Sequence, residues 1–173
     1  DEYTFLIFVT PVGPYYKGGI HPVKALIATE FDRAAPDGVG DCKVGGNYAA
    51  GLAAARFGYD MGYPVVLHLD PKEKRFIDEF STSNFIGIKG NSYVTPKSKS
   101  ILPSITNESL SIIAKDLGMK VERRPIDVAE LPEFSEIGAV GTAAVVTPVT
   151  TIHYKGKNLK FGSEKEAGPV ITK

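Results

Sequence analysis

Two stretches of this 173-residue chain repeat apolar side chains at helical spacing, and the shortage of such stretches constrains the fold more than any other feature. They cover residues 47–61 and 106–117. Most of the remainder consists of short apolar runs separated by Gly, Pro, Asn and Asp, which is typical of strands joined by turns. We therefore predict one β-rich domain of the α/β (α+β) class, with helices surrounding its strands.

The short apolar runs predict most of the sheet. The expected strands cover residues 3–9, 23–29, 64–69, 76–80, 84–89, 92–95, 121–124, 143–149 and 151–154. Glycine and proline predict loops over 11–19 and 32–46, and the run from Asp70 to Lys72 predicts a turn. A short helix is expected over residues 127–131.

Each expected helix has an apolar stripe that its periodicity assigns to the core. The stripe of the first helix consists of Tyr48, Leu52, Ala55 and Tyr59. That of the second consists of Leu110, Ile113, Ala114 and Leu117. Thr106 is the expected N-cap of the second helix, and Gly118 is expected to end it.

The composition gives no reason to expect a nucleic-acid, membrane or metal partner. Twenty basic and twenty acidic side chains cancel, so no excess of positive charge is available to neutralise phosphates. No apolar run approaches the roughly 20 residues that span a bilayer. The three histidines, His21, His68 and His153, lie too far apart to suggest a metal site, and the single Cys42 excludes an internal disulfide.

The segment 38–48 places Lys43 in a glycine-rich loop that leads into the first helix. Glycines in such a loop allow unusual backbone dihedrals or a close approach to a ligand. The spacing fits neither a Walker loop nor a dinucleotide-binding fingerprint. On spacing alone, an ordinary loop lysine and a functional one remain equally good interpretations.

Glu79 is a carboxylate among apolar neighbours in the segment 76–84. Burying it is costly unless it pairs with a cation. The alternative is a solvated acid at a strand end, and the segment alone favours that alternative.

Two further segments could bind anions. Residues 101–106 lead directly into the second helix, whose free N–H groups and positive dipole end suit a phosphate, although Thr106 could simply cap the helix. The run Gly141-Thr142-Ala143 could form a tight turn with donors toward a second anion, or merely a glycine-relieved entry into a buried strand.

The order of these segments resembles the fold-type IV enzymes that use pyridoxal 5'-phosphate (PLP), and most closely the branched-chain amino acid aminotransferases. The resemblance rests on residues 42–49, 79–84, 101–106 and 141–143. It implies the large, cofactor-binding domain of that fold. The family usually has glycine where Ser104 stands, so this chain brings a side chain to the start of the second helix.

The resemblance also implies a role for each matching residue. Lys43 corresponds to the catalytic lysine that binds PLP as a Schiff base, Tyr48 to the tyrosine that hydrogen-bonds the phenolic oxygen, and Glu79 to the carboxylate that pairs with the pyridine nitrogen. A carboxylate there favours the protonated ring that acts as an electron sink. The positions for phosphate are Ile105, Thr106 and Thr142, and those for substrate are Thr82, Thr142 and Ala143.

The activity that the resemblance implies is transamination of leucine, isoleucine or valine with 2-oxoglutarate, in a cytoplasmic homodimer. Residues 1–173 are then the large domain, cut at both ends, without the N-terminal small domain that contributes an arginine to the phosphate. We expect little activity from this chain alone. The alternatives are a D-amino acid aminotransferase, an aminodeoxychorismate lyase or a non-catalytic domain; the run from Lys43 to Tyr48 favours the branched-chain enzymes over the first two.

Overall fold

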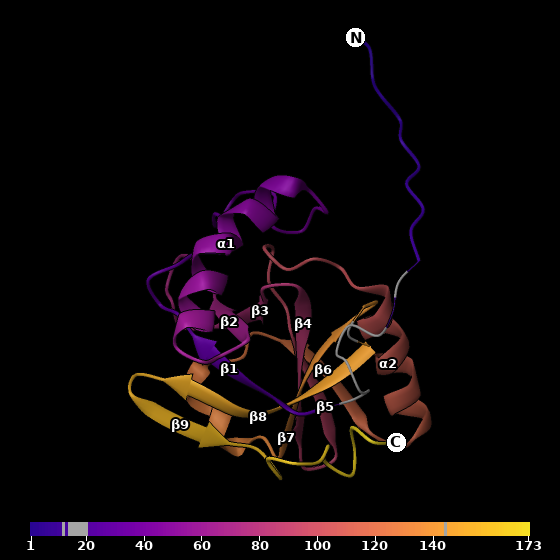
Figure 1. The fold of residues 1–173 in the computed structure, drawn as a ribbon. Helices are drawn as coiled ribbons and strands as arrows, with labels where there is room; N and C mark the ends of the chain where they lie inside the picture. The colour runs from indigo at the N-terminus through magenta and orange to yellow at the C-terminus, as the bar shows by residue number, and fades with distance from the viewer. Residues whose placement is uncertain (12, 14–20, 144) are drawn as a thin grey trace.

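A mixed nine-stranded sheet forms the domain in this computed structural model, which describes residues 1–11, 13, 21–143 and 145–173 (Figure 1). The strands are β1 (Val23–Ile27), β2 (Val65–Leu69), β3 (Ile77–Phe80), β4 (Ser83–Lys89), β5 (Ser92–Pro96), β6 (Lys120–Arg124), β7 (Glu136–Gly141), β8 (Val145–Tyr154) and β9 (Lys157–Lys160). The helices are α1 (Gly45–Asp60), α2 (Ile105–Asp116) and the 3-10 helix η1 (Val128–Glu133). The β-rich α/β class predicted from the sequence is confirmed.

The strand order closes part of the sheet into a barrel. The order is β3-β2-β1-β8-β7-β4-β5-β6, and β3 also pairs with β4, so six strands form a ring. Strand β1 runs parallel to both β2 and β8, whereas β4 is antiparallel to β3, β5 and β7. No helix of the described residues is long and apolar enough to cross a membrane.

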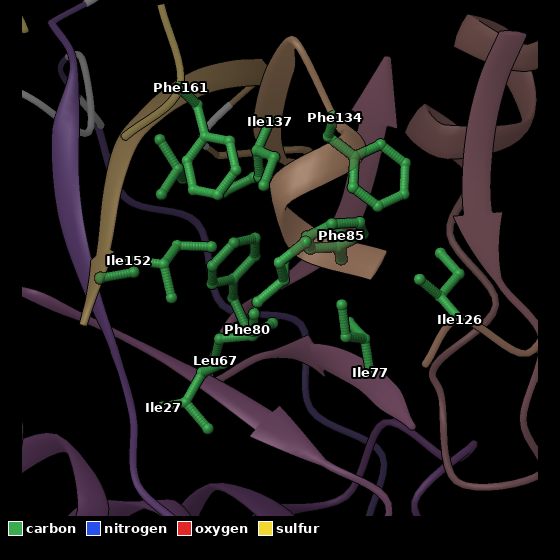
Figure 2. Close-up of a cluster of buried hydrophobic side chains, with 14 of the residues drawn as sticks. Ile27, Leu67, Ile77, Phe80, Phe85, Ile126, Phe134, Ile137, Ile152 and Phe161 are labelled. Carbon is green, nitrogen blue, oxygen red and sulfur yellow. The ribbon is translucent and has the colours of Figure 1, made fainter. Parts of the chain in front are cut away.

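Aromatic and aliphatic side chains fill the interior of this barrel (Figure 2). Phe80 of β3 and Phe85 of β4 stack with ring centroids 5.9 Å apart, and the edge of Phe134 meets Phe85 at 6.0 Å. Gly87 makes room for Phe134, because a Cβ at that position would lie 2.5 Å from the Phe134 ring. The packed interior makes the turns at the strand ends a rigid frame for a site.

Helix α1 packs against β2 through small residues and not through the stripe that its periodicity predicts. Gly51, Ala54 and Gly58 are buried, and a Cβ on Gly58 would lie 2.8 Å from Val66 Cγ2. The prediction that Tyr48, Leu52, Ala55 and Tyr59 face the core is therefore wrong, since none of the four is buried. The helix approaches the sheet closely enough for only its smallest side chains to fit between them.

Helix α2 is capped by a residue that stands earlier in the chain than the one the sequence suggested. Its N-cap is Ser104, whose hydroxyl accepts a hydrogen bond from the Asn107 N–H, so the prediction of Thr106 as N-cap is wrong. Ala114 is buried as predicted, but Ile113 and Leu117 are exposed. Gly118 follows the helix with a φ of +76°, as expected of a residue that ends it.

Other differences concern the two ends of the chain. Residues 3–9, predicted to be a strand, form an exposed arm without strand pairing that extends away from the sheet (Figure 1). Most of the predicted loop 11–19 lies outside the described residues. The two strands predicted over 143–149 and 151–154 form the single strand β8. Strands β7 and β9 were not predicted.

Candidate active site

A cavity of about 750 Å³ opens where four segments distant in sequence meet: the start of α1, the β3–β4 turn, the segment before α2 and the β7–β8 turn. Seven of the eight predicted site residues line this cavity, and only Thr106 does not. The seven are Lys43, Tyr48, Glu79, Thr82, Ile105, Thr142 and Ala143. The fold therefore brings together a lysine, a carboxylate and a helix start.

Lys43 lies just before α1, at the exposed mouth of the cavity. Its Nζ is 5.5 Å from the centroid of the Tyr48 ring, one turn into the helix. The side chain of Asn47 fixes the preceding loop by donating hydrogen bonds to the carbonyl oxygens of Val39 (2.7 Å) and Cys42 (2.9 Å). An amine and a phenol are thus held beside the same cavity.

Glu79, unlike Lys43, is buried, and only 4% of its surface is accessible. The alternative of a solvated strand-end acid is wrong. Burial raises the pKa of its carboxyl group to about 7, although Arg33, the Leu102 N–H and Asn84 all act to lower it. The group therefore changes charge near neutral pH, which is typical of functional carboxyl groups.

The hydrogen bonds of Glu79 leave one side of its carboxylate free for a ligand. Oε1 accepts from the Leu102 N–H at 3.2 Å and forms an ion pair with an amino nitrogen of Arg33, 3.0 Å away. Oε2 accepts from Asn84, at 2.7 Å. A carboxylate offers about four acceptor positions. One acceptor position on Oε2 therefore remains for a donor in the cavity.

Asn84 extends this arrangement to the first turn of α2. Its Oδ1 accepts from Asn107 Nδ2 at 3.2 Å, and Asn107 Oδ1 accepts from the Tyr93 hydroxyl at 2.7 Å. These directions fix the orientation of both amide groups. The carboxylate of Glu79 and the start of α2 are thus joined by one buried hydrogen-bonded chain.

The remaining predicted residues surround the start of α2. Ile105 and Thr106 stand in its first turn, where a helix leaves backbone N–H groups without helical partners. Gly141 approaches the β3–β4 turn, since a Cβ there would be 3.8 Å from the Thr82 carbonyl oxygen. Thr142 and Ala143 form the predicted turn after β7. Ile105, Thr142 and Ala143 line the same cavity, and a helix start offers backbone donors to an anion.

Arg33 is the functional residue that the sequence interpretation missed. It lies in the predicted loop 32–46, 46 residues before Glu79, and no role is predicted for it, yet it lines the cavity and pairs with that carboxylate. The one available signal was the need of a buried Glu79 for a cation. That signal does not say which basic residue supplies it.

The cavity of this β-rich domain thus has both an exposed lysine and a buried carboxylate in its lining. The chain belongs to the class IV amino-transferase family, whose family model matches residues 1–152. Among the described residues, no group of three or more His, Cys, Asp or Glu side chains could hold a metal ion.

Within this family the chain is similar to branched-chain-amino-acid aminotransferases. It is 48% identical to that of Haemophilus influenzae, over 98% of this chain and 51% of the relative. It is 47% identical to that of Helicobacter pylori, over 100% of this chain and 51% of the relative. The chain thus spans about half the length of the curated relatives it matches.

Solved structures show the same likeness. The Escherichia coli branched-chain amino acid aminotransferase superposes with a TM-score of 0.82 at 29% identity, over 94% of this chain and 52% of that chain. The branched-chain aminotransferase of Thermoproteus uzoniensis, solved with norvaline, gives a TM-score of 0.80 at 27% identity, over 94% of this chain and 51% of that chain. The fold-type IV architecture expected from the sequence is therefore confirmed.

Proposed function

We propose that this chain is the large, PLP-binding domain of a branched-chain amino acid aminotransferase. In this proposal residues 1–173 belong to a longer protein, whose further N-terminal domain completes the site. The full protein transfers the amino group of leucine, isoleucine or valine to 2-oxoglutarate. The observation that carries the proposal is the convergence of Lys43, the buried Glu79 and the start of α2 on one cavity.

The cavity suits PLP on structural grounds. Glu79 is a buried carboxylate with one acceptor position left, which matches the protonated nitrogen of a pyridine ring. The first turn of α2 offers backbone donors to a phosphate. When bound, PLP withdraws electrons from the reacting carbon of the amino acid.

Each residue of the site would have its own role toward PLP. Lys43 would supply the amine that binds the cofactor and would then move a proton at the substrate Cα. Ionised Glu79 would accept a hydrogen bond from the protonated ring nitrogen, and Tyr48 would donate one to the phenolic oxygen. The other positions are Ile105, Thr106 and Thr142 for phosphate, and Thr82, Thr142 and Ala143 for the substrate carboxylate.

We further propose that the full protein is a cytoplasmic homodimer. The support is the resemblance to the branched-chain aminotransferase family, although an Arabidopsis thaliana relative, 45% identical, is named as a chloroplastic enzyme. Four segments of this chain line the cavity, and the other half of the longer protein would cover its opening. On its own, the 173-residue chain should therefore turn over valine slowly or not at all.

The proposal is tested by following glutamate formation from leucine, isoleucine or valine and 2-oxoglutarate with the full-length protein. Lys43→Arg keeps the positive charge but removes the primary amine, and it should abolish transfer. The matched control is Lys155→Arg, because Lys155 also lies over an aromatic ring, 5.0 Å from the centroid of Tyr154, and does not line the cavity. Full activity of Lys43→Arg would refute the proposal.

A further inference from the structure

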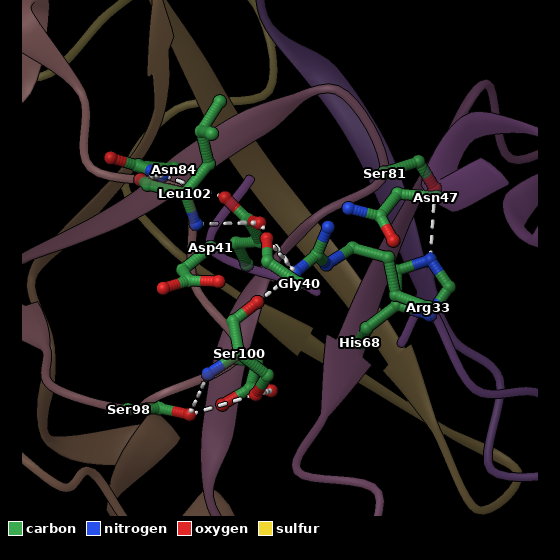
Figure 3. Close-up of polar contacts among 12 residues, drawn as sticks. Arg33, Gly40, Asp41, Asn47, His68, Ser81, Asn84, Ser98, Ser100 and Leu102 are labelled. Atoms are coloured by element: carbon green, nitrogen blue, oxygen red, sulfur yellow. Dashed lines mark hydrogen bonds and ion pairs between the residues drawn. The ribbon is translucent and has the colours of Figure 1, made fainter. Parts of the chain in front are cut away.

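Arg33 lines the cavity, and Figure 3 shows it beside Gly40, with Ser100 close by. One of its amino nitrogens lies 3.0 Å from Glu79 Oε1, and it donates to the carbonyl oxygens of Gly40, at 3.0 Å, and Ser100. Gly40 belongs to the loop that carries Lys43, and Ser100 to the segment that leads into α2. A single guanidinium therefore contacts the lysine loop, the carboxylate and the approach to the anion-binding helix.

The packing around this guanidinium leaves little freedom. Only 8% of the Arg33 surface is accessible. A Cβ on Gly40 would overlap the Ser100 carbonyl oxygen and lie 2.9 Å from the Arg33 amino nitrogen, so this position accommodates only glycine without displacement. The loop before Lys43 is thus pressed against the arginine, and its path depends on where the arginine is held.

Arg33 is also the cation that opposes the burial of Glu79. The charged groups acting on that carboxyl are Arg33, which lowers its pKa, and Asp78, which raises it. His68 lies nearby on β2 but is neutral near pH 7, because burial and then Arg33 lower its pKa to about 4. Without Arg33, burial and Asp78 would act on Glu79 with only neutral hydrogen-bond donors against them.

We propose that Arg33 is a positioning residue of the active site, which keeps Glu79 ionised toward the ring nitrogen and ties the Lys43 loop to the segment before α2. This inference rests on the proposed function for its ligand. The ionisation of Glu79 and the arrangement of the loops are, however, properties of the protein before any cofactor binds. They can be measured without activity.

The direct test is a titration of Glu79 in the cofactor-free protein by NMR of ¹³C-labelled glutamate carboxyl groups, with Glu79→Gln to identify the signal. In Arg33→Met the midpoint should rise by about one to three pH units, the usual effect of losing an adjacent opposite charge. Arg33→Lys keeps a charge without the planar fork, so it should restore part of the midpoint. Arg75→Met is the matched control, because Arg75 pairs with Asp127 at 2.6 Å outside the cavity.

Two further measurements separate positioning from folding. The affinity of Arg33→Met for PLP should fall roughly tenfold or more, following the loss of ionised Glu79 near neutral pH. In the holoenzyme, kcat should fall and then recover at higher pH, which a merely unfolded fraction would not do. If Arg33→Met fails to fold, the Arg33→Lys titration decides alone.

An unchanged Glu79 midpoint in folded Arg33→Met would overturn the inference. If Arg33→Met does not fold, a wild-type midpoint in Arg33→Lys would overturn it. If the proposed function were wrong, the experiments would give a different pattern of results. In that case the wild-type protein would form no adduct with PLP on Lys43, whereas the carboxyl titration would still report whether Arg33 controls Glu79.

Discussion

Replacing Glu79 with glutamine tests the central carboxyl group through the pH dependence of stability. Burial raises the pKa of Glu79 from 4.5 to about 7 in the folded protein. Between these two values the folded state binds more protons than the unfolded state, so the free energy of unfolding falls as pH rises. This stability contribution is fully present below pH 4.5 and lost as the pH passes about 7.

The size of the effect follows from the same two values. The gap between 4.5 and about 7 corresponds to about 3 kcal/mol, at about 1.4 kcal/mol per pH unit. Glutamine has no titrating proton. The difference in unfolding free energy, wild type minus Glu79→Gln, should therefore fall by about 3 kcal/mol between about pH 4.5 and 7. Glutamine also places an amide group next to Asn84 Nδ2, which lies 2.7 Å from Oε2 in the wild type. This lowers the free energy of unfolding by an amount that does not depend on pH.

The assay is urea unfolding of both proteins at about pH 4.5, 5.5, 6.5 and 7.5, with the slopes compared to verify that the unfolded states match. Subtraction removes the contribution of every other titrating group that the substitution leaves unchanged. A difference that is constant with pH within about 0.5 kcal/mol, or that grows with pH, would show that the carboxyl group is not held as its burial and contacts require.

Three further substitutions test the frame around the site. Gly87→Ala should destabilise the protein by about 1–3 kcal/mol in urea unfolding, because its Cβ would lie 2.5 Å from the Phe134 ring; a neutral result would contradict the packing. Ser104→Ala should cost about 1 kcal/mol through loss of the helix cap, and Thr106→Ala should cost less; the reverse order would restore Thr106 as the cap. His68→Gln should abolish a stability gain of about 3 kcal/mol as pH rises from 4 to 6.5, because the folded pKa of His68 is depressed from 6.5 to about 4; an unchanged pH profile would argue against its burial as a neutral group.

The sequence predicted the residues that line the cavity better than the residue that pairs with Glu79. The residues themselves mark Lys43, Glu79 and the start of the second helix only weakly; the resemblance to the aminotransferases assigns their roles, and the fold brings them to one cavity. Arg33 was not predicted, because an arginine in a polar loop is ordinary. Its role depends on a contact 46 residues away in sequence, and local patterns do not report such contacts.

Helix α1 illustrates a second limit of sequence patterns. Its existence followed from periodicity, but its buried face did not. Periodicity assigns the largest apolar side chains to the core, whereas this helix turns Gly51, Ala54 and Gly58 toward the sheet and leaves Leu52 68% exposed. The choice depends on the distance between helix and sheet, which is set by the whole fold and not by the helix.

A PLP site at Lys43 can be tested on the full-length protein by adding PLP, reducing with borohydride and mapping the labelled peptide. We expect a reduced adduct on Lys43, lost in Lys43→Arg and retained in Lys155→Arg. Labelling of a different lysine, or no labelling, would contradict the assignment of this cavity as a PLP site.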